Sequence, residues 1–150
     1  NIAEGMMEAP VPVVMPVHPR TRKRLEEHGL WGPFSTNGNI QALPPVGYLD
    51  FLALMMSSAL IMTDSGGVVE EATSPSIRKR VLVLRPSTER PEAVRAGFAE
   101  VVGTDKRAVI AKVERALKEK GALPRSSPYG NGDAAERIAK VLGSGDALGE

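Results

Sequence analysis

The chain has 150 residues, of which 42% are apolar and 25% charged, and this balance excludes a collagen, a coiled coil or a disordered chain. The 19 basic and 18 acidic residues leave a net charge of +1, so no global field favours nucleic acid or an anionic membrane. With no cysteine and only two histidines, thiolate metal sites are excluded and a typical zinc site is not expected.

Short apolar runs alternate with segments of helical periodicity along the chain. Strands are expected at 11–15, 40–43, 60–63, 81–84 and 99–102. Helices are expected at 2–8, 21–28, 48–58, 67–72, 91–96, 105–118 and 133–142, with loops at 30–39 and 121–132. Strands that are each followed by a helix imply parallel pairing with right-handed crossovers. The pattern predicts an α/β fold, a Rossmann-like three-layer sandwich with a parallel sheet.

The strongest motif is the segment 63–71, Thr-Asp-Ser-Gly-Gly-Val-Val-Glu-Glu, where a buried strand turns into a helix. Ligands of such sheets bind beyond the carboxyl ends of the strands. Gly66 and Gly67 allow backbone amides to approach a ligand, the helix start adds free N–H groups, and Ser65 adds a hydroxyl. The motif predicts a cradle for a phosphate or diphosphate, with a purely structural tight turn as the alternative. It is neither a P-loop nor a Gly-x-Gly-x-x-Gly fingerprint.

Two acidic residues follow in the same helix. Glu70 is interpreted as a cap of the helix N-terminus. Glu71 suits a ribose diol beside a bound diphosphate, because a carboxylate accepts two hydrogen bonds. Taken alone, the residues favour the simpler role of complementing the helix dipole.

Two further strand ends carry candidate ligands. Arg90 follows the 81–84 strand at the same predicted sheet edge as Ser65, where its planar fork could pair with a phosphate. A surface ion pair between Arg90 and a glutamate is an equal alternative. His18 follows the 11–15 strand, where a neutral imidazole could donate to a ligand oxygen, although its residues alone favour a structural turn.

Together these segments resemble the C-terminal part of the non-hydrolysing UDP-N-acetylglucosamine 2-epimerase family. The matching stretches occur in the family's order and cover most of the chain, at 16–21, 47–51, 63–67, 70–72, 88–94, 102–105 and 128–130. The resemblance implies the GT-B architecture, in which two Rossmann-like domains face each other across a cleft. Residues 1–142 are then expected to be the C-terminal nucleotide-binding domain, incomplete at its N-terminus, and residues 143–150 a mobile tail.

The resemblance also implies which residues contact the nucleotide. Ser65, Gly66 and Gly67 correspond to residues that bind the diphosphate, and Glu71 to the residue that binds the ribose. Phe51 corresponds to the position whose backbone meets uracil.

Two other residues also match positions that the family uses for ligands. Arg90 corresponds to an arginine of the substrate site, and His18 to a histidine that helps some bacterial members to hold a second, activating UDP-N-acetylglucosamine. No residue of this chain is assigned a catalytic role, because the family's acid and base residues lie in parts that the chain does not contain.

The implied function is that of the UDP-binding part of an isomerase that interconverts UDP-N-acetylglucosamine and UDP-N-acetylmannosamine. The family eliminates UDP across C1 and C2 and then adds it back with the opposite configuration at C2. Alternatives are a hydrolysing UDP-N-acetylglucosamine 2-epimerase, a GT-B glycosyltransferase and a non-catalytic UDP-sugar-binding module. This chain alone is expected to be inactive.

The expected partners are UDP-N-acetylglucosamine or UDP and the missing N-terminal domain of the same enzyme, with a homodimer as an option. No cofactor, metal, nucleic acid or membrane is expected. The longest apolar run, 51–63, is shorter than the roughly 20 residues that span a bilayer. The lack of cysteine fits a reducing compartment, so a cytoplasmic location is expected.

Overall fold

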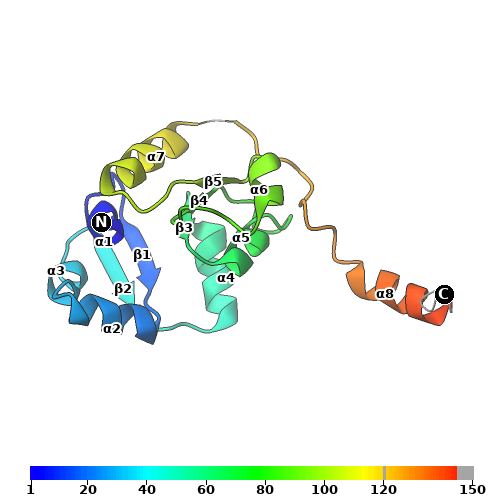
Figure 1. Ribbon diagram of the computed structural model, residues 1–150, viewed down its shortest axis with the longest axis horizontal. Coiled ribbons are helices and arrows are strands. Elements are labelled where there is room, and N and C mark those ends of the chain that lie inside the picture. The colour runs from blue at the N-terminus through cyan, green and yellow to red at the C-terminus, as the bar shows by residue number, and fades with distance from the viewer. Residues whose placement is uncertain (120, 145–150) are drawn as a thin grey trace.

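The computed structural model describes residues 1–119 and 121–144, in which short strands alternate with helices (Figure 1). The strands are β1 (Val13–Pro16), β2 (Ile40–Leu43), β3 (Ile61–Thr63), β4 (Val81–Val83) and β5 (Ala99–Val101). The helices are α1 (Ile2–Met7), α2 (Pro19–Glu27), α3 (Trp31–Ser35), α4 (Tyr48–Ser57), α5 (Gly66–Ala72), α6 (Pro91–Arg95), α7 (Lys106–Lys118) and α8 (Ala134–Gly143). The predicted α/β class is confirmed.

The strands pair in parallel but form two sheets, whereas the sequence predicts one. In the smaller sheet β1 pairs with β2, and Val13 lies opposite Ile40. In the larger sheet the order is β3-β4-β5, and Ile61, Val81 and Ala99 lie side by side. Within the described residues β1 and β3 each pair on one side only, and β1 is the strand of its sheet nearer to β3 (Figure 1). A continuous sheet requires these two strands to be direct neighbours, and they are not hydrogen-bonded.

Apolar side chains hold the layers together on both faces of the larger sheet. Residues of α4, α5 and α6 pack on one face, where Val81 and Val83 point. Leu82 points to the other face and joins a second core with residues of α1 and α7. This second core also contains Val13 and Ile40, so side-chain packing joins the two sheets where backbone hydrogen bonds do not.

The segment expected to be a loop at 30–39 contains the short helix α3, so that prediction was wrong. Its glycine and proline indicate a loop. Pro33, however, lies in the first turn of the helix, where backbone N–H groups have no intrahelical partner, so the N–H that proline lacks costs no helical hydrogen bond. The side chain of Phe34 is only 1% exposed and anchors the helix in the core. The hydroxyl of Thr36 donates to the carbonyl oxygen of Gly32 at 2.8 Å and closes its end. Tertiary packing therefore overrides the local signal.

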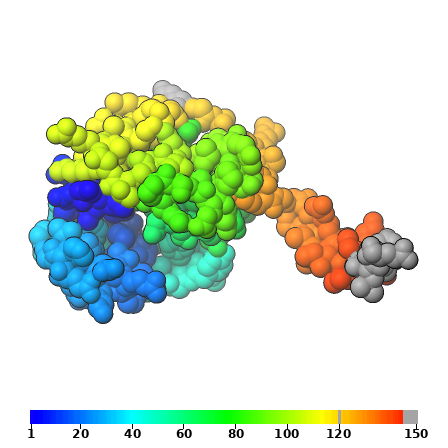
Figure 2. Space-filling view, in the orientation of Figure 1, coloured from blue at the N-terminus to red at the C-terminus, as the bar shows by residue number. Residues whose placement is uncertain are grey.

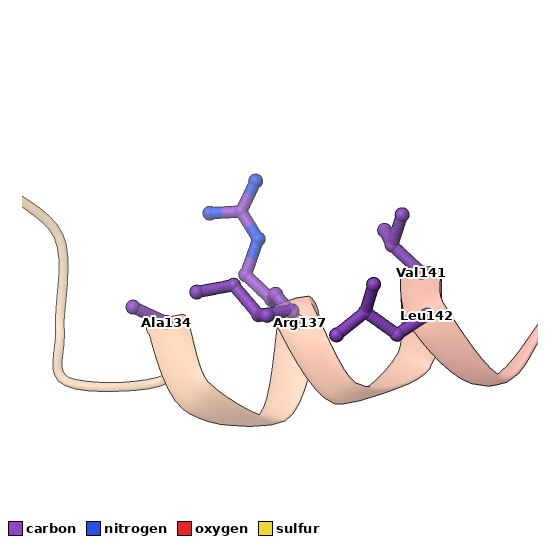
Figure 3. Close-up of a pocket in the computed structure, with 5 residues that line it drawn as sticks. Ala134, Arg137, Val141 and Leu142 are labelled. Carbon is purple, nitrogen blue, oxygen red and sulfur yellow. The ribbon is translucent and has the colours of Figure 1, made fainter. Parts of the chain in front are cut away.

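The last helix, α8, extends away from the rest of the molecule (Figures 1 and 2). Ile138, Val141 and Leu142 on this helix are 60%, 53% and 69% exposed. Figure 3 shows Ala134, Val141 and Leu142 along it, with the Arg137 side chain rising beside them. The hollow between them is lined by this one helix, so it is an open helix surface and not an enclosed site.

The predicted mobile tail begins at the end of α8. Gly143 is the last residue of the helix and Ser144 caps it. Residues 145–150, the remainder of that prediction, lie outside the described residues. None of the helices that the structure describes is long and apolar enough to cross a bilayer.

Candidate nucleotide-binding edge

The predicted turn from strand to helix is present at the end of β3. Ser65 is the N-cap of α5, and its Oγ accepts from the Val68 amide at 3.5 Å. The Ser65 amide in turn donates to Oγ1 of Thr63 at 3.0 Å. Gly66 and Gly67 are the first two residues of the helix, where backbone N–H groups have no partner four residues back. The turn thus presents amide donors at the carboxyl end of the strand.

Arg90 lies against this turn, as predicted for a residue that follows the neighbouring strand. Its guanidinium carbon is 3.5 Å from the point where a Cβ on Gly66 would stand. Its Nε donates to Oε1 of Glu70, and its Nη1 donates to the carbonyl oxygen of Glu89 at 3.1 Å. The side chain is 32% exposed. The ion pair considered as an alternative therefore exists, and it holds the guanidinium beside the glycine turn.

The interpretation of Glu70 as a helix cap was wrong. Ser65 is the N-cap, which makes Glu70 the fifth residue of α5, beyond the first turn. Capping requires a side chain that can reach the unpaired amides of that first turn. The Glu70 carboxylate instead binds Arg90.

Glu71 has a partner that the sequence did not indicate. The hydroxyl of Tyr48, the first residue of α4, donates to Oε1 of Glu71 at 3.3 Å. The negative charge of Glu71, together with burial and this hydrogen bond, raises the pKa of Tyr48. The phenol therefore keeps its proton at neutral pH and acts as the donor.

The same two side chains border a groove of about 250 Å³ between α4 and α5. It is lined by Tyr48, Leu52, Met56, Glu71, Ser74, Ser76 and Ile77. Its apolar wall comes from α4, and Glu71 supplies a carboxylate at its rim. The sequence signals for Tyr48 were its place directly after Gly47, at the start of a helix that follows a strand, and its position within the matching stretch 47–51.

Phe51 lies one turn into α4. Its amide donates to the carbonyl oxygen of Gly47 at 2.9 Å, as expected in the first turn of a helix. Its side chain packs against the core beneath α4, α5 and α6. Phe51 is thus partly buried, and it belongs to the same helix as Tyr48, the residue that contacts Glu71.

His18 belongs to the other sheet and does not share these contacts. It follows β1, is exposed, and is the N-cap of α2. Its Nδ1 accepts from the Arg20 amide at 3.2 Å, so the neutral ring carries its proton on Nε2. The predicted turn role is present, and Nε2–H remains the group that could donate outward.

The structure therefore brings most of the predicted site residues to one edge. Ser65, Gly66, Gly67 and Arg90 lie together, with Glu71 one helical turn further along α5. Among the residues that the structure describes, no group of three or more histidine, aspartate and glutamate side chains is gathered around a metal position.

Parallel strands between helical layers, with a Ser-Gly-Gly turn and an arginine at the strand ends, define a Rossmann-like α/β domain. The sequence profile of the UDP-N-acetylglucosamine 2-epimerase family matches residues 2–143. The chain belongs to this family.

Curated relatives agree with the profile. The UDP-N-acetylglucosamine 2-epimerase of Methanocaldococcus jannaschii is 41% identical over 146 residues, which cover 95% of this chain and 39% of the relative. The enzyme of Escherichia coli K12 is 43% identical over 136 residues, 88% of this chain and 35% of the relative. The chain thus spans less than two fifths of these relatives and corresponds to a partial, C-terminal piece.

Solved structures give the same result. The M. jannaschii UDP-GlcNAc 2-epimerase superposes with a TM-score of 0.81 at 40% identity, covering 96% of this chain and 40% of that one. A structure of the same epimerase in complex with UDP-GlcNAc and UDP gives a TM-score of 0.79 at 42% identity, covering 89% and 36%. The predicted GT-B relationship is confirmed.

Proposed function

We propose that this chain is the UDP-binding part of a UDP-N-acetylglucosamine 2-epimerase, an isomerase that interconverts UDP-N-acetylglucosamine and UDP-N-acetylmannosamine. The observation that carries the proposal is the position of Arg90 over Gly66, beside the amides at the start of α5. The solved M. jannaschii relative that contains UDP-GlcNAc and UDP supports this choice of ligand.

In this proposal the diphosphate lies on Ser65, Gly66 and Gly67. Amide N–H groups at a helix start are suited to phosphate oxygens, and the guanidinium adds a positive charge and a planar pair of donors. Glu70 accepts from Nε of Arg90 and the carbonyl oxygen of Glu89 accepts from Nη1, so the proposal assigns Nη2 and the second N–H of Nη1 to the ligand. The salt bridge then acts as a support that fixes the direction of the arginine.

The nucleoside end of UDP is assigned to the helices beside this turn. Glu71 accepts from the ribose hydroxyls, and the backbone at Phe51 lies next to uracil. His18 is assigned to a second UDP-N-acetylglucosamine, toward which its Nε2–H would donate. His18 follows β1 of the smaller sheet and is the N-cap of α2.

These residues contribute to catalysis by retaining the leaving group. When UDP is eliminated, negative charge grows on the β-phosphate oxygen, and preformed donors stabilise that charge. The same contacts keep UDP in place for its return to C1. Proton transfer at C2 is assigned to parts of the enzyme outside this chain.

The proposal extends to partners and location. The N-terminal domain of the same enzyme would close the cleft over the nucleotide, and the assembly to test is a homodimer, by light scattering of the full enzyme. A cytoplasmic location is proposed because a chain without cysteine suits a reducing compartment.

Ligand-observed NMR of the purified chain with UDP, UDP-N-acetylglucosamine and ADP tests the binding proposal. We expect saturation transfer to both uridine nucleotides, and a smaller transfer in Arg90→Ala. For ADP we expect no more transfer than a non-specific contact with its diphosphate would give. Equal binding of UDP and ADP would reduce the site to a diphosphate site without base recognition. No binding of UDP would overturn the proposal.

A further inference from the structure

The contact between Tyr48 and Glu71 has no role in the function proposed above. It joins the first residue of α4, which follows β2, to α5, which follows β3. The two residues are 23 positions apart in the sequence, and β2 and β3 belong to different sheets. The hydrogen bond is thus a tertiary link at the start of two helices that border the candidate site.

The Tyr48 ring is not part of the core. It is 62% exposed, and the packing of α4 is carried by buried Met55 and partly buried Phe51 and Leu52. An exposed tyrosine gains little from burial, so the hydroxyl contact is the distinctive feature of this side chain.

The contact determines how Glu71 presents its carboxylate. Glu71 is half-buried on α5, and its Oε1 is occupied by the phenol. A glutamate carboxylate rotates about a broad terminal torsion, so a fixed donor on one oxygen selects the direction of the other. The raised pKa of Tyr48 agrees with a phenol that remains protonated and donates.

The neighbouring acid has a different partner. Glu70 is bound to Arg90, so the two consecutive glutamates are divided between a cation and a phenol. The guanidinium compensates the negative charge of the Glu70 carboxylate. The neutral phenol leaves the charge of the Glu71 carboxylate uncompensated, so its other acceptor positions can still attract a hydrogen-bond donor.

We propose that Tyr48 is a positioning residue that aims Oε2 of Glu71 at the ribose hydroxyls and thereby gives the site its preference for ribonucleotides over nucleotides that lack these hydroxyls. This inference rests on the proposed role of Glu71 in UDP binding. The ligand class follows from the chemistry, because a vicinal diol offers two donors to a carboxylate that has free acceptor positions.

The experiment compares the Kd of UDP with that of 2′,3′-dideoxy-UDP for the wild-type chain and for Tyr48→Phe. We expect Tyr48→Phe to weaken UDP by about threefold to tenfold, the usual effect of one hydrogen bond. Binding of the dideoxy nucleotide should change by less than about twofold, since it has no hydroxyls for Glu71 to accept from. Thr36→Val is the control, because it removes one hydroxyl hydrogen bond, to the carbonyl oxygen of Gly32 in α3, and its preference for UDP over the dideoxy nucleotide should equal that of the wild type.

A double-mutant cycle separates positioning from a structural effect. In a Glu71→Ala background, Tyr48→Phe should no longer change the ratio between the Kd of UDP and the Kd of 2′,3′-dideoxy-UDP. If Tyr48→Phe weakens both nucleotides equally, or changes neither, the positioning role is overturned although UDP binding stands. If the wild-type chain does not bind UDP, the proposed function falls and this inference falls with it.

Discussion

The guanidinium carbon of Arg90 lies 3.5 Å from the point where a Cβ on Gly66 would stand. The Arg90 guanidinium therefore rests on the start of α5, beside the amides of the first turn. Glu70, one turn further along, holds it there. A Cβ on Gly66 would be in ordinary van der Waals contact with the guanidinium, so the position excludes a larger, branched side chain, and its φ is not in the left-handed region.

Gly66→Val is expected to abolish UDP binding in the purified chain. The branched side chain would displace the Arg90 guanidinium and cover the amides that are assigned to the diphosphate. Ligand-observed NMR with UDP measures the loss. Gly32→Val, in helix α3, is the matched control, because nothing lies within 4 Å of a Cβ at that position. Unchanged binding in Gly66→Val would place the diphosphate elsewhere.

Glu70 and Glu71 are expected to respond differently to alanine. Glu71→Ala should weaken UDP binding by about 1–3 kcal/mol, the cost of an unpaired polar group in the complex. Glu70→Ala should lower the free energy of unfolding by at most about 1 kcal/mol, since its ion pair is partly exposed. It should weaken UDP binding less than Glu71→Ala does. Isothermal titration and urea unfolding of both variants check this division. An equal loss of affinity in the two variants would contradict it.

The stability of the chain should fall with acid through Glu100, which binds Lys112 and Arg115 of α7. Burial alone would raise the pKa of this carboxyl, but hydrogen bonds and charge from the two cations outweigh it, and the pKa is lowered from 4.5. A lowered folded-state pKa gives stability that is complete above the unfolded value and is lost as pH falls through the folded one. Urea unfolding between pH 7 and pH 3 should therefore show a shallower acid loss in Glu100→Gln than in the wild type. Parallel curves would exclude Glu100 as the source.

The chain by itself is expected not to epimerise UDP-N-acetylglucosamine. Turnover requires a base and a positioned acid. The candidates at the strand ends are His18, Asp64, Glu71, Glu89 and Glu92, and the family resemblance gives none of them that role. Glu89 and Glu92 pair with surface arginines, and Glu71 is held by Tyr48. Binding should persist with a Kd on the order of 0.1–1 mM, because the contacts of the other domain are missing.

Incubation with UDP-N-acetylglucosamine in heavy water, followed by mass spectrometry, measures this directly. Neither deuterium at C2 nor UDP-N-acetylmannosamine is expected. Either one would show that the catalytic groups lie within these 150 residues.

The sequence predicted those strands, helices and turns that depend on residues close together in the sequence. The apolar run at Val81–Val83 forms a central strand, and the Ser-Gly-Gly turn after β3 leads into helix α5. The side-chain partners were less accessible, because they join residues about 20 positions apart. No local pattern distinguishes Glu70 bound to Arg90 from Glu71 bound to Tyr48, since that choice depends on how α4, α5 and α6 pack.

The division into two sheets was not predictable for the same reason. Each strand has the composition of a buried parallel strand, and composition does not specify which strands become neighbours. The helix α3 was missed because Gly32 and Pro33 are typical of loops, whereas the burial of Phe34 is decided by the rest of the fold.

The division into two sheets also determines which amide protons exchange first with solvent. β4 is hydrogen-bonded on both sides, and its three side chains are at most 2% exposed, so its amides should exchange only when the whole domain opens. Among the described residues, β1 and β2 have no backbone hydrogen bond to the larger sheet, and apolar side chains around Val13, Ile40 and Leu82 join them to β4. Their amides should exchange earlier, through a partial opening that leaves β3, β4 and β5 paired. The smaller sheet would then behave as a separate cooperative unit of lower stability.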